Sequence, residues 1–389
     1  MTIDPLSLAG VSNAASVLAA SLPGAPVWQL DPGVVHVVGY RACRSALLDP
    51  TRFSSDLTRY GPTGLGGEPA PARTMNAVDP PAHGELRSVC AGPFTRRAVD
   101  ALSPELARLA DGLLDPLVEQ GSFDVVRDFA GPYVQGVLAS VLGLSPGRET
   151  DLQHWSDTIT APNGRHEVER ARRELKELFA ELAARPSELP AGSLLRTLRS
   201  AYDDGLLSWE QLLATCVLLV VAGAETTRNL VSSTVLTMAE QGDLIVALRQ
   251  SPHAAMAVTD EALRLHSSVA AAVRYTTRDT SLAGVPIRGG CPMFIWLGAA
   301  NRDPAEFDDP DTFVVERTRR QHLALGAGPH VCLGAHLARI EISTALVALA
   351  RRVDRLEIDG SVIWLPSPLA RGPQQARVIC TPPERRAGA

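Results

Sequence analysis

Hydrophobic and polar positions follow the period of an α-helix along most of this chain. The clearest case is the segment 208–242, which opens with Ser208 and Gln211 in a capping-box pattern and closes at Gly242, a residue that commonly ends helices. Its middle, LLVVAGAETT, is apolar nearly all round, as in a helix buried at the centre of a protein. A helix of roughly 33 residues is about 50 Å long, so this one is expected to cross the whole molecule. Shorter helices are predicted at 40–48, within 85–142 with breaks near Gly92 and Gly121, at 167–184, after Pro252, and at 335–352.

Strand-like patterns are confined to short stretches. Apolar residues at 34–38 predict one strand, and the region 273–297 predicts several, with turns at Ala283-Gly284 and Gly289-Gly290. The segment 58–73, TRYGPTGLGGEPAPAR, is so rich in glycine and proline that no regular element is expected there. The predicted fold class is therefore mainly α with a minor β component.

The charge balance and the cysteines narrow the classes of protein. Lys and Arg number 37 against 43 Asp and Glu, so the chain lacks the basic excess typical of a nucleic-acid-binding protein. Its hydrophobic content of 45% is enough for a large core and argues against disorder. The six cysteines form no C-x-x-C pair, which argues against a zinc ribbon. Without a basic region at the N-terminus or a run of about 20 predominantly apolar residues, we expect a cytoplasmic protein that binds neither membrane nor nucleic acid.

Candidate chemistry is concentrated in the segment LGAGPHVCLG at 325–334. Its glycines and proline shape a tight loop, and Cys332 lies just before the helix predicted at 335–352. A thiolate at a helix N-terminus is stabilised by free backbone N–H groups and by the helix dipole, which lowers its pKa and suits it to bind a metal. The alternative is a buried structural cysteine in a turn.

This segment resembles the haem-binding loop of the cytochromes P450. It matches the family pattern F-G-x-G-x-H-x-C-x-G at every position but the first, where Leu325 stands in place of phenylalanine. The resemblance implies a cytochrome P450 fold with haem b between the long central helix and the helix after the cysteine loop. It makes Cys332 the axial thiolate of the haem iron and His330 a partner for a haem propionate, with Gly326 and Gly334 as further cofactor-binding positions. Because Leu325 replaces that phenylalanine, it is expected to affect the redox potential of the haem iron.

A second motif lies in the middle of the long helix. The sequence AGAETT, which begins at Ala222, looks like the family's A-G-x-[DE]-T-T signature. The resemblance implies that Gly223 and Thr226 border an oxygen-binding notch and that Ala222 and Gly223 are cofactor-binding positions. It also makes Glu225 and Thr226 catalytic residues that organise water and proton delivery. A carboxylate in an apolar helix is costly to bury unless it is paired or used. The alternative is an ion pair between Glu225 and Arg228 on a surface-facing turn.

Cationic residues that could hold the propionates lie in three separate segments. The sequence DPPAHGELR at 79–87 resembles the family's D-P-P-x-H-x-x-x-R. His83 and Arg87 are four apart, so on a helix they share one face and can both reach an anionic group. Arg274 fits the family's propionate-binding arginine, and with His330 these residues form the expected cation set. A solvated pair at a helix start is the alternative for His83 and Arg87.

Glu261 and Arg264 fit the family's E-x-x-R motif, for which the resemblance implies a structural ion pair. The pattern alone is weak evidence, since it also begins at Glu105, Glu167, Glu169, Glu225 and Glu316. The copy at Glu261 lies between the long helix and the run ANRDP at 300–304, followed by Phe307, Pro310 and Phe313, which is the family's order.

The resemblance implies a haem-thiolate monooxygenase that uses O2 as co-substrate and two electrons to hydroxylate or epoxidise a small organic, natural-product substrate. Small side chains at Val269, Ala270 and Ala271 predict a roomy pocket that admits a bulky or carrier-tethered molecule. Two alternatives stay open. The same cofactor could serve oxidative coupling, desaturation or ring formation, or the chain could be a catalytically idle haem-binding or sensor protein.

Length alone, at about 150 residues per domain, predicts two or three domains. The resemblance replaces this with a single domain over 1–389, because residues from Arg87 to Cys332 must meet around one haem. With no flavin or iron–sulfur module in the sequence, electrons are expected from a separate ferredoxin and ferredoxin reductase. Their docking face is expected near Cys332, on a basic patch made by Arg87, Arg96, Arg97 and Arg339. We expect a monomer.

Overall fold

The computed structural model describes residues 14–20, 25–30, 33–60, 73–145, 147–160, 164–318 and 321–383. Its α-helices are α1 (Ala14–Ala19), α2 (Tyr40–Leu48), α3 (Leu57–Tyr60), α4 (Ala82–Cys90), α5 (Arg96–Glu119), α6 (Gly131–Leu142), α7 (Glu149–Thr160), α8 (Arg165–Ala183), α9 (Leu194–Asp203), α10 (Trp209–Glu240), α11 (Asp243–Gln250), α12 (Pro252–His266), α13 (Leu297–Ala300) and α14 (Ala335–Ala350). Its strands are β1 (Val27–Leu30), β2 (Val34–Val37), β3 (Phe53–Ser54), β4 (Ser122–Asp124), β5 (Ala272–Thr276), β6 (Thr280–Leu282), β7 (Val285–Ile287), β8 (Pro292–Ile295), β9 (Arg355–Ile358), β10 (Ile363–Trp364), β11 (Pro373–Gln375) and β12 (Arg377–Thr381). The predicted class, mainly α with a minor β component, is confirmed.

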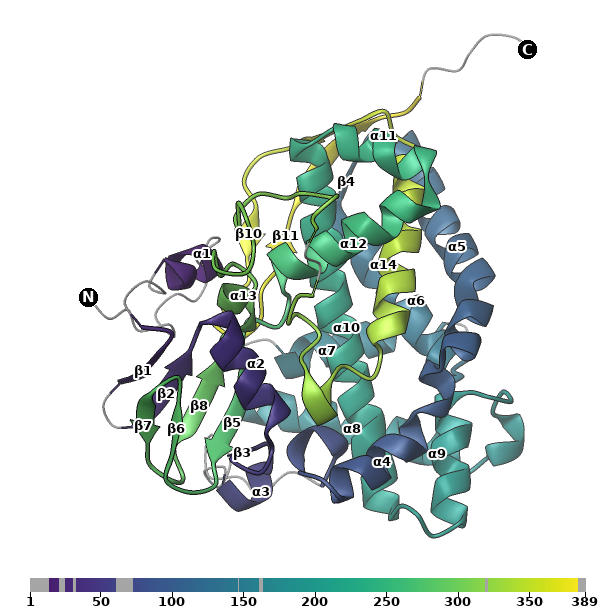
Figure 1. Ribbon diagram of the computed structural model, residues 1–389. Helices are drawn as coiled ribbons and strands as arrows, with labels where there is room; N and C mark the ends of the chain where they lie inside the picture. Colours follow the sequence, from purple (N-terminus) through teal and green to yellow (C-terminus); the bar gives the residue numbers. More distant parts are fainter. Residues whose placement is uncertain are drawn as a thin grey trace.

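The long helix α10 runs through the middle of the molecule (Figure 1). Its predicted capping box is confirmed, because the Gln211 N–H donates to the Ser208 hydroxyl at 3.1 Å and the Ser208 N–H donates to the Gln211 side chain at 2.9 Å. The helix has 32 residues and is buried continuously from Thr227 to Met238. Five helices pack against it, so it forms the centre of the helical part of the molecule. They are α6, α7, α8, α12 and α14.

Within the described ranges, α10 is the one helix long and apolar enough to cross a membrane by length and composition. The expectation that the chain has no such run is therefore wrong for this helix. The central helix of a soluble protein has the same property, since neighbours on several sides require apolar residues nearly all round. Five packed helices give α10 that environment here.

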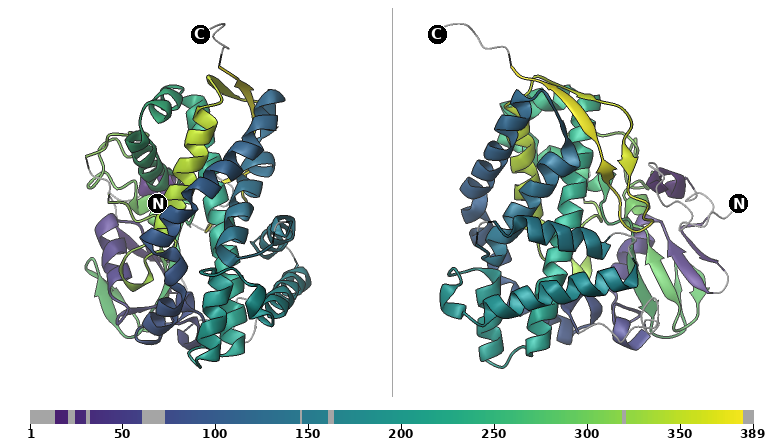
Figure 2. Two further views of the ribbon diagram at one scale, coloured as in Figure 1. Left: turned by 90° about the vertical axis from the view of Figure 1, so that its right-hand side faces the viewer. Right: turned by 180° about the vertical axis from the view of Figure 1, so that it is seen from behind.

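The main sheet is built from two distant parts of the chain. Its strand order is β1-β2-β8-β5-β3, and β2 pairs in parallel with β8, with Val35 opposite Met293. Most of the helices lie between these two strands in sequence, and they pack beside the sheet rather than over both of its faces (Figures 1 and 2). The turn predicted at Ala283-Gly284 joins β6 to β7, and both residues have positive φ, as a type I′ hairpin turn requires.

Two hydrophobic cores hold the site in place. The larger one joins α5, α6, α10, α12 and α14, and the smaller one lies between the main sheet and α2. Helix α14 packs along α5 and α12, so the cysteine loop that precedes α14 is anchored by the larger core.

The glycine-rich segment 58–73 differs in part from its prediction. Residues 58–60 belong to the short helix α3, so the expectation that no regular element forms in this segment is wrong for its first turn. The glycines and prolines begin only at Gly61, which leaves these first residues able to be helical. Residues 61–72 lie outside the described part of the chain.

Candidate functional site

The cysteine loop takes its shape from two glycines with positive φ. Gly326 has φ +74° and Gly328 has φ +71°, a region that L side chains rarely adopt. A Cβ on Gly328 would lie 2.5 Å from the carbonyl oxygen of Leu47 on α2, so the loop approaches that helix too closely for a side chain. The Cys332 N–H donates to the Leu325 carbonyl at 2.8 Å and closes the loop. Gly334 then forms the N-cap of α14.

Cys332 lines a cavity of about 600 Å³ that is mostly apolar. Burial raises the pKa of its thiol, while the Gly334 N–H and the charges of Arg87 and Arg339 act in the opposite direction. The lowered pKa expected from the helix N-terminus is therefore wrong for the protein alone, because desolvation outweighs these donors and charges. A cation bound to the sulfur would favour the thiolate.

The expected notch on α10 faces the same cavity. Ala222, Gly223 and Thr226 all line it, and the Thr226 hydroxyl donates to the Ala222 carbonyl at 2.7 Å. A Cβ on Gly223 would lie 2.7 Å from Cδ2 of Leu138 on α6, so this close contact between helices requires glycine or a shift of Leu138. Glu225 is not among the lining residues. The ion pair that was its alternative role is also absent among the described contacts, because Arg228 pairs with Asp157.

Four groups that can carry positive charge gather at one part of the cavity. The rings of His83 and His330 have their centroids 4.2 Å apart, and Arg87 and Arg274 line the cavity beside them. Burial, with Arg274, His83 and Arg87, lowers the pKa of His330 to about 3. Burial also lowers the pKa of His83, helped by Arg87 and Arg274, and that of Arg274 to about 10. The sequence prediction that these residues meet is confirmed by their placement.

This cavity fits the haem that the sequence resemblance implies. The Nε2 atom of His330 is buried and, among the described residues, has no hydrogen-bond partner. A guanidinium as buried as that of Arg274 is costly without an anion. A flat apolar group with two carboxylates answers both needs, and Cys332, Leu325 and Gly326 line the same cavity. These residues would hold the haem, with Cys332 as the ligand of its iron.

Glu261 and Arg264 form the expected ion pair in the interior, where their side chains are 4% and 1% exposed. Nε and Nη2 of Arg264 donate to the two carboxylate oxygens of Glu261 at 2.9 and 2.7 Å. The sequence motif missed a third member, Arg317, whose Nε donates to Glu261 Oε1 at 3.1 Å. Arg264 also donates to carbonyls of the 301–312 segment, so the cluster fixes the chain that leads to the cysteine loop.

The predicted substrate segment is only partly in the cavity. Val269 lines it, whereas Ala270 and Ala271 do not, so the expectation for these two alanines is wrong. Ala271 packs against Trp296 and Ala299, and the Ala270 N–H donates to the Leu369 carbonyl at 2.8 Å. The sequence pattern of small residues carried no information on which side each would face.

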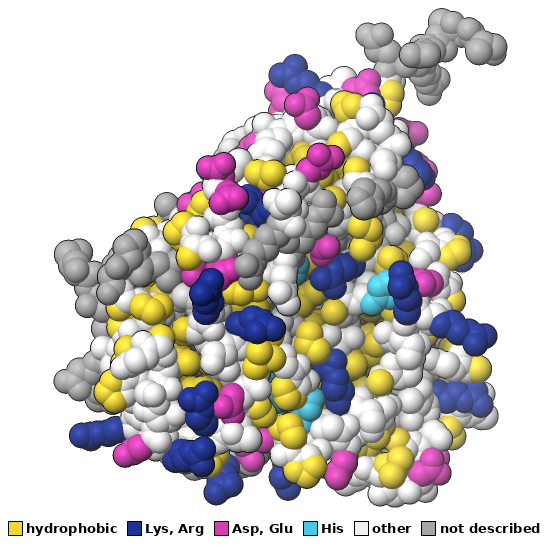
Figure 3. All heavy atoms as spheres, in the orientation of Figure 1, with side chains coloured by type: hydrophobic (Ala, Val, Ile, Leu, Met, Phe, Trp, Pro, Cys, Tyr) yellow, Lys and Arg dark blue, Asp and Glu magenta, His cyan; other side chains and the backbone are white. Residues whose placement is uncertain are grey.

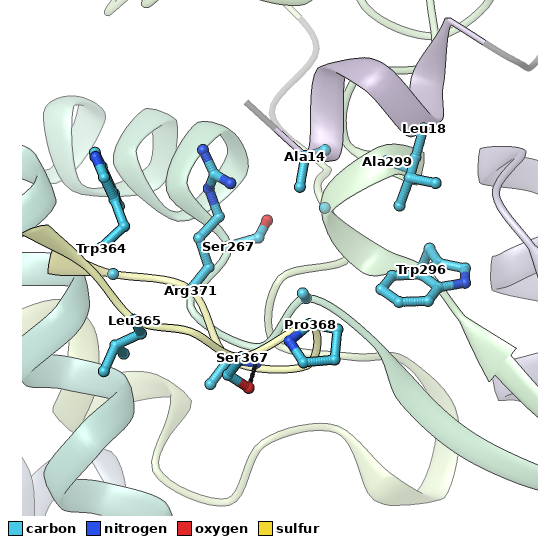
Figure 4. A pocket seen from close by; sticks show the side chains of 15 residues that line it. Ala14, Leu18, Ser267, Trp296, Ala299, Trp364, Leu365, Ser367, Pro368 and Arg371 are labelled. Carbon is cyan, nitrogen blue, oxygen red and sulfur yellow. Dashed lines mark hydrogen bonds between the residues drawn. The ribbon is translucent and has the colours of Figure 1, made fainter. Parts of the chain in front are cut away.

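Ala270 instead lines a second, smaller pocket of about 30 Å³ (Figure 4). Figure 4 shows this pocket between α1, α13 and the C-terminal segment that carries Trp364, Pro368 and Arg371. The guanidinium of Arg371 lies 5.5 Å from the centre of the Trp364 ring. The pocket is separate from the cavity at Cys332.

Only part of the predicted basic patch is exposed and free to contact a partner protein. Arg339 donates to Asp260 at 2.8 Å and Arg87 lines the cavity, whereas Arg96 and Arg97 are exposed. Basic side chains spread across the middle of the face in Figure 3, which holds α2, α4 and the start of α14, while acidic ones lie mostly in its upper part and along its lower edge.

Comparisons with known proteins agree with the fold and the cavity. The family model described as "Cytochrome P450" matches residues 165–362. The chain is 33% identical to cytochrome P450 monooxygenase PikC of Streptomyces venezuelae, over 86% of this chain and 82% of the relative. It is 32% identical to cyclomarin C epoxidase CymV of Salinispora arenicola, over 87% and 88%.

Solved structures agree as well. The crystal structure of P450BioI in complex with an acyl carrier protein ligated to hexadec-9Z-enoic acid aligns with a TM-score of 0.86 and 28% identity, over 95% of this chain and 99% of that one. Coverage at this level on both sides means that the shared features extend over the whole fold and not only over the cysteine loop. The chain therefore belongs to the cytochrome P450 family and is a monooxygenase of that family.

Proposed function

We propose that this protein binds haem b through Cys332 and uses O2 and two electrons to hydroxylate or epoxidise a small organic, natural-product substrate. One observation carries the proposal. A single apolar cavity is lined by Cys332, by the notch at Ala222, Gly223 and Thr226, and by a cluster of two arginine and two histidine side chains.

Each group has a distinct task in this proposal. Arg87 and Arg274 neutralise the haem propionates, His83 and His330 donate hydrogen bonds to them, and Cys332 ligates the iron. When bound, the haem supplies the reductive activation of O2. Thr226 uses its proton to bond the Ala222 carbonyl, so its oxygen is left as an acceptor that can orient water or a donated proton. Glu225, whose pKa burial raises, supplies protons to that hydroxyl.

The cavity supports a substrate that is mainly apolar. It has about 600 Å³, which the haem and the substrate share, and Leu142, Leu218, Val269 and Ala272 are among its apolar lining. PikC and CymV act in the oxygenation chemistry their names state, and the P450BioI structure holds a carrier-bound acyl chain. By extension from these relatives, we propose a free or carrier-tethered natural product as the substrate class of this chain.

A second reaction type stays beside the first. One solved relative, the cytochrome P450 enzyme CxnD, is described as acting in C–S bond formation in chuangxinmycin biosynthesis, and it aligns at 28% identity with a TM-score of 0.86. The same cavity in this chain could therefore serve coupling, desaturation or ring formation. Product analysis with a bound substrate separates these outcomes from hydroxylation.

We further propose a single-domain, cytoplasmic monomer that receives electrons from a ferredoxin and its reductase. The exposed Arg96 and Arg97 near the start of α5 support a docking face for an acidic ferredoxin. Charge reversal at both arginines is expected to slow reduction and to weaken its salt dependence. Unchanged rates at low and high salt would contradict this docking face.

The test of the proposed function starts with the purified, haem-loaded protein. Its reduced CO complex should show the red-shifted Soret band of a thiolate-ligated haem, and Cys332→Ser should lose that band. Titration of the ferric protein with candidate substrates should shift the iron's spin state when one binds. An unshifted Soret band in the wild-type protein would contradict the proposed function.

Oxygen activation is tested at Thr226. Thr226→Ala removes the acceptor in the notch, so more of the electrons consumed should be released as hydrogen peroxide and fewer should appear in product. Thr234→Ala is the matched control, because the Thr234 hydroxyl donates to the Leu230 carbonyl at 2.7 Å on the same helix and Thr234 does not line the cavity. Equal coupling in wild type and Thr226→Ala would show that the assigned role is wrong.

A further inference from the structure

The cysteine loop has a polar contact at each of its two ends, and both contacts involve one carboxylate. Asp260 lies on α12, next to Glu261 of the buried ion cluster. Its Oδ1 atom accepts a hydrogen bond of 2.8 Å from Nε of Arg339 on α14, and it lies 3.7 Å from Nε2 of His322. His322 precedes the loop and Arg339 follows it in sequence, so Asp260 is placed to act on both ends.

His322 connects Asp260 to the start of the loop. Its Nδ1 accepts the backbone N–H of Ala324, the residue before Leu325, at 3.3 Å. A neutral imidazole that accepts at Nδ1 carries its proton on Nε2, and Nε2 is the atom next to Asp260. The His322 side chain is 4% exposed, and its Nε2 has no hydrogen-bond partner within the described ranges. The Asp260 carboxylate is therefore the charge that stabilises this buried proton.

Arg339 connects Asp260 to the end of the loop. Its Nη1 donates to the carbonyl of Ala335, the first residue of α14, at 3.2 Å. Burial raises the pKa of the Cys332 thiol, and the charge of Arg339 is one of the effects that lower it. The same guanidinium is thus bonded to the Asp260 carboxylate and acts on the sulfur of Cys332.

Asp260 is a carboxylate at neutral pH. Burial by itself would raise its pKa, but His322 and Arg339 together lower the pKa below its usual value. Its negative charge therefore offsets part of the positive charge that Arg339 presents to the sulfur. The side chains of Asp260 and Arg339 are only 26% and 28% exposed, so water screens these charges less than it would at the surface.

Two simpler roles explain these contacts less well. A docking face would need the guanidinium of Arg339 to be free, whereas its Nε is bonded to Asp260. A tie between α12 and α14 would need only the contact with Arg339, and these two helices already pack together within the larger apolar core (Figure 1). Neither role explains why the same carboxylate oxygen also lies beside His322, ahead of the loop.

We propose that Asp260 is a positioning residue for the haem-binding cysteine, which holds both ends of the cysteine loop through His322 and Arg339 and limits how strongly Arg339 stabilises the thiolate. This role rests on the proposed function, in which Cys332 ligates the haem iron. The loop also has a separate contact, because the Leu323 N–H donates to Oδ1 of Asn301 at 2.6 Å. Loss of the Asp260 charge should therefore loosen the loop without unfolding it.

The first measurement is the midpoint potential between the ferric and ferrous forms of the haem-loaded protein, followed in the Soret band. The added electron makes the site one unit more negative, so nearby positive charge favours the reduced form. Asp260→Asn keeps the shape of the side chain but removes its charge, and should raise the midpoint potential. Arg339→Gln should lower it. A purely structural tie does not predict opposite shifts, so shifts in the same direction, or none, would overturn the proposal.

The second measurement does not depend on haem chemistry. Amide hydrogen exchange of the same protein, read by mass spectrometry on peptides that cover residues 324–336, should become several-fold faster in Asp260→Asn, because one carboxylate serves both ends of the loop. Asp260→Glu keeps the charge and should recover much of the protection and the potential. Exchange at the wild-type rate across the loop in Asp260→Asn would overturn the positioning role.

Asp100→Asn is the matched control. Asp100 is also hydrogen-bonded to a side chain of α14, with its Oδ1 atom 2.8 Å from Nε2 of His336. The substitution makes the same change of charge, but the Asp100 side chain is 51% exposed and is therefore well screened by water. Asp100→Asn should leave the midpoint potential and the loop exchange close to those of the wild type. Equal effects of Asp100→Asn and Asp260→Asn would show that Asp260 has no special role.

Failure of the proposed function would look different. The wild-type protein itself would then lack the thiolate band in its reduced CO complex, whereas hydrogen exchange across the loop could still be compared between the wild type, Asp260→Asn and Asp100→Asn.

Discussion

The buried cluster around Glu261 offers the sharpest prediction of stability. The guanidinium of Arg264 is bonded to both oxygens of Glu261 and to the carbonyls of Asn301 at 2.9 Å, Pro310 at 2.7 Å and Thr312 at 3.0 Å. Arg264→Ala removes all of these donors at once. Arg264 also packs over the ring of Phe307, 5.4 Å from its centre.

The loss of unfolding free energy in Arg264→Ala depends on which of its partners keep another hydrogen bond. Glu261 keeps Arg317 Nε and the Val314 N–H, and the Thr312 carbonyl keeps Arg317 Nη2 at 2.9 Å. Among the described contacts the carbonyls of Asn301 and Pro310 lose their Arg264 donor, at about 1–3 kcal/mol each. With a weakened buried ion pair, we expect Arg264→Ala to lower the free energy of unfolding by about 3–5 kcal/mol.

The assay is urea unfolding of the haem-loaded protein, followed by far-UV circular dichroism, with haem release followed separately in the Soret band. Arg170→Ala is the control, because Arg170 ends the same E-x-x-R pattern on α8 but is 63% exposed and lies 3.9 Å from Glu174. It should cost about 0–1 kcal/mol. If Arg264→Ala is no more destabilising than Arg170→Ala, the reasoning from buried donors is wrong.

Three other predictions follow from the same structure. Gly328→Ala should prevent the cysteine loop from closing, since its Cβ would meet the Leu47 carbonyl at 2.5 Å where φ is +71°; the reconstituted protein should hold several-fold less haem, and normal haem content would contradict this. Burial lowers the pKa of His266 to about 3, so the folded state resists protonation of this side chain. The free energy of unfolding should therefore fall as the pH drops from about 6.5 toward 3, by about 1–2 kcal/mol at pH 5. In urea unfolding, His266→Gln should show a weaker dependence on acid pH than the wild-type protein. Arg274→Met should leave the haem-free protein as stable as wild type or more so, because it removes a buried charge beside other cationic groups, yet it should release haem faster to apomyoglobin; slower or equal release would refute a role in propionate binding.

Much of the fold could be predicted because its signals are local. The capping box at Ser208, the apolar course of α10 and the periodicity of α8 and α14 each depend on residues within a few turns of one another. The cysteine loop is local as well, since its glycines set their own backbone angles. These features were predicted from the sequence with ends correct to within a few residues.

The site could be predicted only where a motif joined distant segments. Local patterns do not show that the rings of His83 and His330 lie 4.2 Å apart, and the family resemblance supplied the link between their segments. Arg317 was missed because no spacing ties it to Glu261, from which it is separated by the whole sheet region. The misplaced Ala270 and Ala271 show the same limit, since the direction of a side chain in an extended segment depends on how the strand docks.

The sequence by itself determined the helices, the cysteine loop, the notch motif and the kind of chemistry they imply, because each is encoded in neighbouring residues. Tertiary structure alone decided which groups share a cavity, that burial raises the thiol pKa of Cys332, and that Arg228 pairs with Asp157 instead of Glu225. Desolvation and ion pairing depend on everything that packs around a group, and that environment comes from parts of the chain far apart in sequence.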